Sequence, residues 1–253
     1  MKTKSIFLST FLTTLALTIC VQSYGLQAGT VAEALASTDR SAADLERDER
    51  SQPEAVLDHF GIQAGQSVLD LFAGGGYYSE IASYVVGADG KVYLHNNQAY
   101  LGFAGKALEE RLKDDRLSGV IRYDKEVDAI DLEENSIDLV LMVMTYHDLY
   151  YKTDGWDIDP DNFFAMLHRV LKPGGVLGIV DHVGATGSGS NAAQAVHRID
   201  PAFAREDIEA HGFRFAGELD ALKNPNDKLD VSVFDPSVKG KTSRFVYKYV
   251  EPE

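Results

Sequence analysis

The stretch VLDLFAGGGYYS, residues 68–79, decides the fold of this chain. An apolar run ends here in three glycines, and a stretch with helical character follows. A strand that leads into a glycine turn and then a helix brings bare backbone to the carboxyl edge of a parallel sheet, where a ligand can approach closely. Asp70 stands near the end of that strand, and its negative charge suits a cationic ligand group rather than a pyrophosphate.

The segments on either side of this turn alternate between strands and helices. We predict core strands over 67–72, 91–95, 120–123, 137–144 and 176–180. Helices are predicted over 53–60, 77–86, 99–114 and 160–171. Near-continuous apolar strands separated by helices are what a parallel sheet covered on both faces requires.

The end of the chain has a different pattern. Residues 213–219 and 244–250 alternate between apolar and polar side chains, which predicts two antiparallel strands at the sheet edge. Between them, residues 220–243 are polar and long for a simple connection, which favours a functional or partly ordered segment. The predicted fold class is therefore α/β, a Rossmann-like seven-stranded, mostly parallel sheet with helices on both faces and an antiparallel strand at one edge.

The first 25 residues are typical of a secretory signal peptide. Lys2 and Lys4 precede an apolar run over 6–21, and small residues follow up to Gly25. We expect export to the periplasm; an uncleaved membrane anchor is the alternative. Cleavage would remove Cys20, the only cysteine, and with it any disulfide or thiol chemistry; lipidation at Cys20 is a weaker alternative.

The rest of the chain divides into two predicted parts. Residues 26–52 form an N-terminal helical extension, with one or two exposed amphipathic helices over 31–48, and residues 53–253 form the main domain. A formal net charge of −15 argues against a nucleic-acid-binding face, which would need clustered Lys and Arg. We expect a small-molecule substrate and no stable membrane insertion after leader cleavage; the oligomeric state stays open.

The glycine turn resembles motif I of class I S-adenosylmethionine-dependent methyltransferases. The resemblance continues, in the family's order, through 87–93, 128–129, 136–140 and 171–177. With the leader and the tripeptide at 146–148, the chain is similar to exported predicted methyltransferases. The resemblance implies the cofactor S-adenosyl-L-methionine, for which a generic Rossmann protein is the alternative.

The same resemblance assigns residues to the parts of the cofactor. Those implied to bind it are Asp70, Gly74 and Gly76 at the methionine part, Asp128 and Ala129 at the adenine, Met144 beneath the ligand, Asn96 at the ribose and Tyr78 over the sulfonium. Asp124 competes with Asp128 for the adenine. Tyr77 and Tyr78 could equally pack the first helix of the domain.

Two positions depart from the family pattern. Phe72 stands where the first glycine of the turn is usual, and Asn96 stands where the second strand should end in an acid that holds both ribose hydroxyls. An uncharged amide makes weaker hydrogen bonds than a carboxylate. The missing acid also weakens an NAD-binding interpretation, which needs the same group.

The candidate catalytic residues follow the fourth and fifth core strands. They are His147, a possible general base with an ordinary pKa near ~6.5, Asp148, which could orient the substrate, and His182. Each could instead be structural, and the different directions of neighbouring side chains argue against a His147–Asp148 dyad. His197, near Arg198, is a further candidate for substrate contact.

Other side chains near the predicted site are interpreted as structural. Arg47 and Arg50 fit a solvated helix face better than a lid, and Trp156 with its acidic neighbours is expected in a surface loop. No metal is predicted, although His147 and Asp148 with Asp181 and His182 could hold one. The predicted function is methyl transfer from S-adenosylmethionine to a small molecule; the alternative is a non-catalytic binding protein on the same fold.

Overall fold

A computed structural model describes residues 28–253 of the chain. The predicted signal peptide and Cys20 lie outside the described residues. Among residues 28–253, no helix is both long enough and apolar enough to cross a bilayer.

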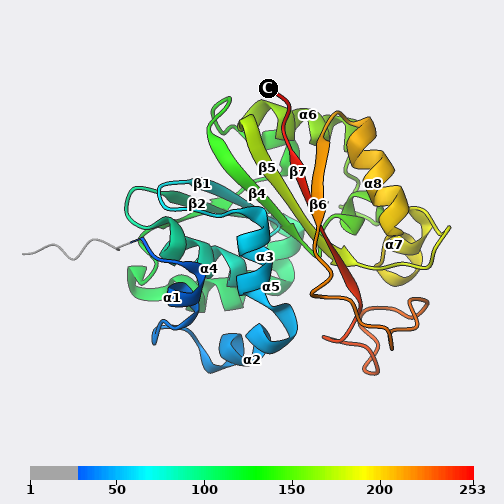
Figure 1. Cartoon of the computed structure of the whole chain (residues 1–253), viewed down its shortest axis with the longest axis horizontal. Helices are drawn as coiled ribbons and strands as arrows, with labels where there is room; N and C mark the ends of the chain where they lie inside the picture. Colours follow the sequence, from blue (N-terminus) through cyan, green and yellow to red (C-terminus); the bar gives the residue numbers. More distant parts are fainter. Residues whose placement is uncertain (1–27) are drawn as a thin grey trace, which may run out of the picture.

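A seven-stranded sheet forms the centre of the molecule (Figure 1). Its strands are β1 (Ser67–Leu71), β2 (Lys91–Asn96), β3 (Val120–Asp124), β4 (Ile137–Val143), β5 (Leu171–His182), β6 (Arg214–Glu218) and β7 (Arg244–Val250). Their order across the sheet is β3-β2-β1-β4-β5-β7-β6. Strands β1 to β5 are parallel to one another, whereas β7 runs antiparallel to both β5 and β6. The predicted fold class is confirmed, with the antiparallel strand one place in from the edge.

Helices cover both faces of this sheet. They are α1 (Val31–Leu35), α2 (Ala42–Ser51), α3 (Pro53–Phe60), α4 (Tyr77–Val86), α5 (Gln98–Leu112), α6 (Pro160–Val170), α7 (Asn191–Val196) and α8 (Pro201–Ala210). Figure 1 shows α1 to α5 around the β1–β2 half of the sheet and α6 to α8 around the β5–β6 half.

The core has two layers because alternate strand residues point to opposite faces. On one face, α3 and α4 bury Phe60 and Ile81 against Val68 and Leu141. On the other, α6 buries Phe163 and Leu167. The N-terminal extension is less exposed than predicted, because Val31 and Ala34 of α1 join the first of these layers.

The turn between α6 and β5 differs from the prediction. The helix begins as predicted, with Asp159 accepting a hydrogen bond from the Asn162 N–H (2.9 Å). It ends at Val170, and β5 begins directly at Leu171 rather than at Val176. A register shift between Ile137 and Leu139 accommodates the Lys-Pro-Gly-Gly segment inside the strand, so these residues form an irregular strand start and not a loop.

Two segments outside the sheet border its carboxyl edge. One is α2, and the other is the long segment 220–243, which contains neither helix nor strand (Figure 1). Both contribute side chains to a cavity of about 640 Å³, including Arg50 from α2 and Phe234 from the long segment. The segment is fastened by a fully buried ion pair between Arg198 and Asp227 (2.8 Å).

Candidate functional site

A cavity of about 480 Å³ lies at the carboxyl edge of β1, β4 and β5. The turn after β1 contributes Ala73, Gly74 and Gly75, and the segment after β4 contributes Met144. The carboxyl edge is where open α/β sheets bind their ligands. The cavity thus lies at the sheet edge where the glycine turn predicts the site.

The glycine turn is built on left-handed backbone. Phe72 has φ 54°, followed by Gly74 at 57° and Gly76 at 77°, so Phe72 adopts the conformation that favours the glycine usual at its position. A Cβ added to Gly76 would lie 2.6 Å from Leu94 Cδ1. Gly76 therefore serves close packing, and it does not line the cavity, whereas Gly74 and Gly75 do.

Asp70 lies behind the turn and not on the cavity wall. Its side chain is buried, and its Oδ2 accepts a hydrogen bond from the Ser79 hydroxyl (2.6 Å). Burial raises the pKa of Asp70 to about 6, although the Ser79 hydrogen bond and the nearby Arg47 charge oppose the shift. Any attraction for a cationic ligand would act across the turn, and the role of Asp70 at the methionine part stays a prediction.

Asn96 is committed to the turn itself. Its Oδ1 accepts from the Gly74 N–H (2.8 Å), and its Nδ2 donates to the Gly74 carbonyl (3.0 Å). The side chain is fully buried, so the predicted contact with the ribose is not available in this arrangement. Tyr78 is likewise buried, with its hydroxyl 3.5 Å from the Ser51 carbonyl, and does not line the cavity as a cover for the sulfonium would.

Asp128 lines a second cavity, of about 990 Å³, which shares Gly155 and Trp156 with the first. Asp128 and Ala129 form the short 3-10 turn Val127–Ala129, and Ala129 lines neither cavity. The competing candidate Asp124 is paired with Arg122 (2.6 Å) and also lines neither. The geometry favours Asp128 over Asp124 as the residue nearest an adenine.

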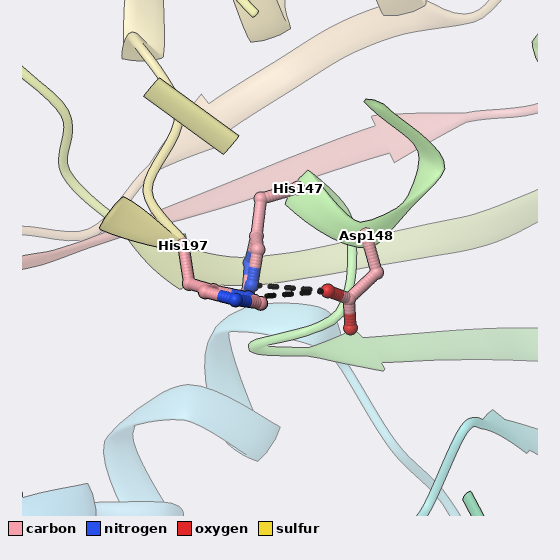
Figure 2. A group of neighbouring side chains, drawn as sticks. All are labelled: His147, Asp148 and His197. Carbon is pink, nitrogen blue, oxygen red and sulfur yellow. Dashed lines mark ion pairs between the residues drawn. The ribbon is translucent and has the colours of Figure 1, made fainter. Parts of the chain in front are cut away.

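His147 and Asp148 both line the first cavity, and Figure 2 shows their side chains close together. A 3-10 turn, His147–Tyr150, replaces the extended backbone that would have separated their side chains, and His147 Nε2 lies 3.2 Å from Asp148 Oδ1. The expectation that these neighbours point in different directions was wrong for this reason. The general-base role of His147 stays a prediction.

Asp181 positions His147. The fully buried Asp181 accepts from His147 through both the backbone N–H (2.7 Å) and Nδ1 (2.8 Å). Burial favours the neutral ring, but the charges of Asp181 and Asp148 outweigh it and raise the pKa of His147 above its ordinary value. The sequence analysis considered Asp181 only as a metal ligand, because its partner is far away in sequence.

His182 also lines the cavity but has a different environment. Its Nδ1 lies 2.8 Å from the Thr242 hydroxyl, and burial lowers its pKa to about 3. The ring is therefore neutral at physiological pH. The His182 ring lies beside the His147 ring, with 5.9 Å between their centroids. A ligand in the cavity could therefore contact both rings.

Further side chains gather at this cavity. His197, the predicted candidate for substrate contact, lines it and reaches Asp148, with 3.8 Å between Nδ1 and Oδ1. Trp156 lies in the predicted loop among exposed neighbours, but its own side chain is buried, and its indole N–H donates to the Asp148 carbonyl (2.7 Å). Arg47 lines the cavity, where its guanidinium lies 4.0 Å from the centre of the Tyr77 ring. Tyr100 donates its hydroxyl proton to Asp148 Oδ2 (2.6 Å).

The signals for these residues were weak because they come from segments without a recognisable motif. Arg47 lies on α2, where its periodicity suggested a solvated face. Trp156 precedes the Asp159 cap of α6, and Phe234 lies within the long polar segment 220–243. Only the folding of these segments over the sheet edge places them together.

Comparisons with known proteins agree with this geometry. Residues 69–179 match the protein family described as "Methyltransferase domain". Over 128 residues the chain is 29% identical to the ubiquinone/menaquinone biosynthesis C-methyltransferase UbiE of Escherichia coli K12. That alignment covers 50% of this chain and 46% of the relative, so the chain spans about half the length of the curated relatives it matches.

Solved structures extend the likeness to most of the chain. An S-adenosylmethionine-dependent methyltransferase from Aquifex aeolicus is 25% identical, with a TM-score of 0.60 over 81% of this chain and 93% of that one. Geranyl diphosphate C-methyltransferase from Streptomyces coelicolor A3(2), solved with Mg²⁺, a substrate analogue and S-adenosyl-L-homocysteine, shares the fold with a TM-score of 0.56 at 13% identity, over 87% and 84% of the two chains. These structures confirm the predicted methyltransferase-like fold, and the match over residues 69–179 and the Aquifex aeolicus structure agree with the predicted enzyme class and with S-adenosyl-L-methionine as its cofactor.

Proposed function

We propose that this chain, which carries a methyltransferase domain of the S-adenosyl-L-methionine-dependent type, transfers a methyl group to a small molecule bound in the cavity between the glycine turn and His147. The single observation that carries the proposal is the lining of this cavity. It includes both the bare backbone of Gly74 and Gly75 and the side chains of His147 and Asp148. A donor and an acceptor can meet in this cavity.

The donor would occupy both cavities. Its amino acid part fits beside Gly74 and Gly75, with the Asp70 carboxylate behind the turn, and Met144 lies on the wall of the same cavity. Its adenine fits the second cavity beside Asp128, which adjoins the first at the shared lining residues Gly155 and Trp156. The cofactor supplies a sulfonium methyl group, and the transfer breaks its S–CH₃ bond while a bond from the acceptor's nucleophilic atom to the methyl carbon forms.

The acceptor is proposed to have an aromatic or apolar body. Aromatic side chains contribute much of the cavity lining, among them Phe72, Tyr100, Phe103 and Phe234. The polar lining includes Arg47, the His147–Asp148 cluster, Thr153 and Asp154. A flat molecule with one polar end would fill such a site, because a few placed polar groups orient a ligand whose affinity comes from apolar contact.

Calorimetric titration with three ligands tests the proposal. S-adenosylmethionine and S-adenosylhomocysteine carry the amino acid part, whereas adenosine does not. We expect Asp70→Asn to weaken binding of the first two by about tenfold, or 1.4 kcal/mol, and to leave adenosine unchanged. The exposed Asp89, replaced by Asn, is the matched control for the loss of one negative charge. Failure to bind the donor at millimolar concentration would contradict the proposal.

The alternative of a non-catalytic binding protein draws on one specific observation. Asn96 replaces the acid that should hold the ribose hydroxyls, and its amide is occupied by Gly74. A nucleoside-binding protein would bind adenosine as tightly as S-adenosylmethionine in the same titration. Donor binding that depends on the amino acid part favours the enzyme.

Export is part of the proposal. The basic start and apolar run of the first 25 residues motivate it. Expression of the full chain in a bacterial host, followed by fractionation and intact-mass measurement, is expected to give a periplasmic protein shortened near Gly25. A full-length cytoplasmic product would contradict export without touching the proposed reaction.

A further inference from the structure

We propose that His147, Asp148 and His197 bind a divalent transition-metal ion in the floor of the cavity. Each side chain offers one ligand atom, and the three atoms lie within 4.8 Å of one another (Figure 2). This inference replaces the expectation that the chain holds no metal. It also changes the ligand set considered from the sequence, because His197 takes the place of Asp181 and His182.

The three side chains converge from two separate segments. His147 and Asp148 come from the turn after β4, and His197 follows α7. Asp148 Oδ1 lies between the two imidazoles, 3.2 Å from His147 Nε2 and 3.8 Å from His197 Nδ1. Ligand atoms at ~2.1 Å from one ion are separated by about 3 to 3.5 Å, so only small side-chain rotations are needed to close the site.

The hydrogen bonding of His147 leaves its Nε2 directed at a negative oxygen. Nδ1 donates its proton to Asp181, so a neutral ring presents the Nε2 lone pair to Asp148 Oδ1. This contact is favourable when a cation lies between the two atoms, either a proton on Nε2 or a metal ion. A metal ion bound by both atoms would take the place of that proton, and a carboxylate behind the histidine is the usual support for such a ligand.

The other two proposed ligands, Asp148 and His197, are also held in place by neighbouring side chains. Tyr100 donates to Asp148 Oδ2, which leaves Oδ1 free for an ion. The His197 ring is fixed between Tyr151 and Phe234, at centroid distances of 4.5 and 4.9 Å. Two imidazoles and one carboxylate suit Zn²⁺, Fe²⁺ or Co²⁺, and leave coordination positions open toward the cavity.

The consequence for the acceptor rests on the proposed function. An ion at this site would bind an oxygen or nitrogen at the polar end of the acceptor and hold it against the donor. The assignment also excludes the predicted general-base role of His147, since an Nε2 that binds a metal has no lone pair for a proton. The metal site itself does not depend on methyl transfer and can be tested without the donor.

Titration of the tag-free, chelator-treated chain with Co²⁺ tests the site, because bound Co²⁺ absorbs visible light in a way that reports its ligands. We expect one ion per chain, displaced by Zn²⁺. His197→Asn should abolish this binding, and asparagine suits the left-handed backbone at this position (φ 53°). Asp181→Asn, a positioning change, is expected to weaken binding by about 10- to 100-fold.

The matched control is His211→Asn. His211 also faces two acids, with 3.0 Å to Asp161 and 3.6 Å to Asp207, but lies outside the cavity. Its replacement should leave Co²⁺ binding unchanged, and thermal unfolding confirms that every variant is folded. No saturable Co²⁺ or Zn²⁺ binding, or equal binding by His197→Asn, overturns the site and leaves a protonated His147 paired with Asp148. Donor titration in chelator separates that outcome from failure of the proposed function.

Discussion

The side chain of Asn96 and the backbone of Gly74 form a closed pair of hydrogen bonds, of 2.8 and 3.0 Å, that ties the end of β2 to the glycine turn. The position that the family resemblance assigned to the ribose therefore holds the shape of the turn instead. A carboxylate here could accept from the Gly74 N–H but could not donate to its carbonyl. The amide is needed because it offers both functions in one side chain.

Replacing Asn96 with Asp is expected to destabilise the protein. The buried carboxylate would face the Gly74 carbonyl with no proton between them, at a cost of about 1–3 kcal/mol in the free energy of unfolding. Urea unfolding at neutral pH measures the loss, and calorimetry should show no tighter binding of S-adenosylmethionine. A variant that is equally stable and binds the donor more tightly would show that this side chain can leave Gly74 and reach the ribose.

Phe72 gives a prediction about backbone strain. Its φ of 54° lies in the left-handed region. The centroid of its ring lies 5.1 Å from that of Tyr100 and 5.3 Å from that of Trp156. Both Phe72→Ala and Phe72→Gly lose this packing, at about 3–5 kcal/mol. Because left-handed backbone costs a non-glycine residue about 1 kcal/mol or more, the Gly variant should be the more stable of the two.

The control for this comparison is the same pair of substitutions at Phe163, which lies within α6. There Gly should be the less stable variant, by about 1 kcal/mol, because it has a lower helix propensity than Ala. Denaturant unfolding of the four variants, Ala and Gly at each of the two positions, measures both differences in stability. The same order of stability at both positions would mean that the backbone of Phe72 is not strained.

These examples show which features of the molecule were predictable from the sequence. Hydrophobic periodicity located the seven strands, and it also predicted the helix over 53–60 and the start of the helix at residue 160, because each depends on residues close together in the chain. The position of the site followed from the glycine turn. The His147–Asp148 contact was not predicted because it depends on a 3-10 turn whose backbone no local motif announces.

Other residues at the site were not predicted for a different reason. Arg47, Asp181 and Phe234 reach the cavity only because α2, β5 and the segment 220–243 converge on one sheet edge. Contacts of such sequence separation leave no periodic signal. Asn96 could be recognised as a departure from the family pattern, but its partner Gly74 could not be identified before the turn was placed beside β2.

His95 is expected to make stability depend on pH. Its ring is fully buried, with Nδ1 accepting from the Phe72 N–H (3.3 Å) and Nε2 donating to the Lys125 carbonyl (2.8 Å), and burial lowers its pKa to about 4. In the unfolded chain His95 has its ordinary pKa near ~6.5. Between about pH 4 and 6.5 the ring is therefore protonated in the unfolded chain but neutral in the folded protein. The contribution of His95 to the free energy of unfolding should fall by up to about 3 kcal/mol as the pH drops from about 6.5 to about 4, and stay constant below that pH.

The variant His95→Gln isolates this contribution. Glutamine keeps one donor and one acceptor but does not titrate, so the unfolding free energy of the unaltered protein minus that of the variant should fall as the pH drops from about 6.5 to about 4. Asp70 has the opposite sign, because its raised pKa makes the folded state the better proton binder between about 4 and 6. Parallel pH dependences for the variant and the unaltered protein would rule out a neutral, buried His95.

The Arg198–Asp227 pair is expected to hold the segment 220–243, which carries Phe234, against the rest of the cavity wall. Both side chains are fully buried, and Asp227 also accepts from the Ser243 N–H (2.6 Å), so one carboxylate fastens the two ends of the segment that carries Phe234. Arg198→Met leaves this carboxylate buried without its cation, which is expected to cost about 3–5 kcal/mol. The double variant Arg198→Met with Asp227→Asn removes the unpaired charge while keeping an acceptor for Ser243, so it should be more stable than the single variant.

Limited proteolysis within 220–243, measured alongside urea unfolding, should show faster cleavage of Arg198→Met than of the double variant. Equal stability of the two variants would mean that water reaches Asp227 once the arginine is gone, and that the segment is held by its apolar contacts rather than by this ion pair.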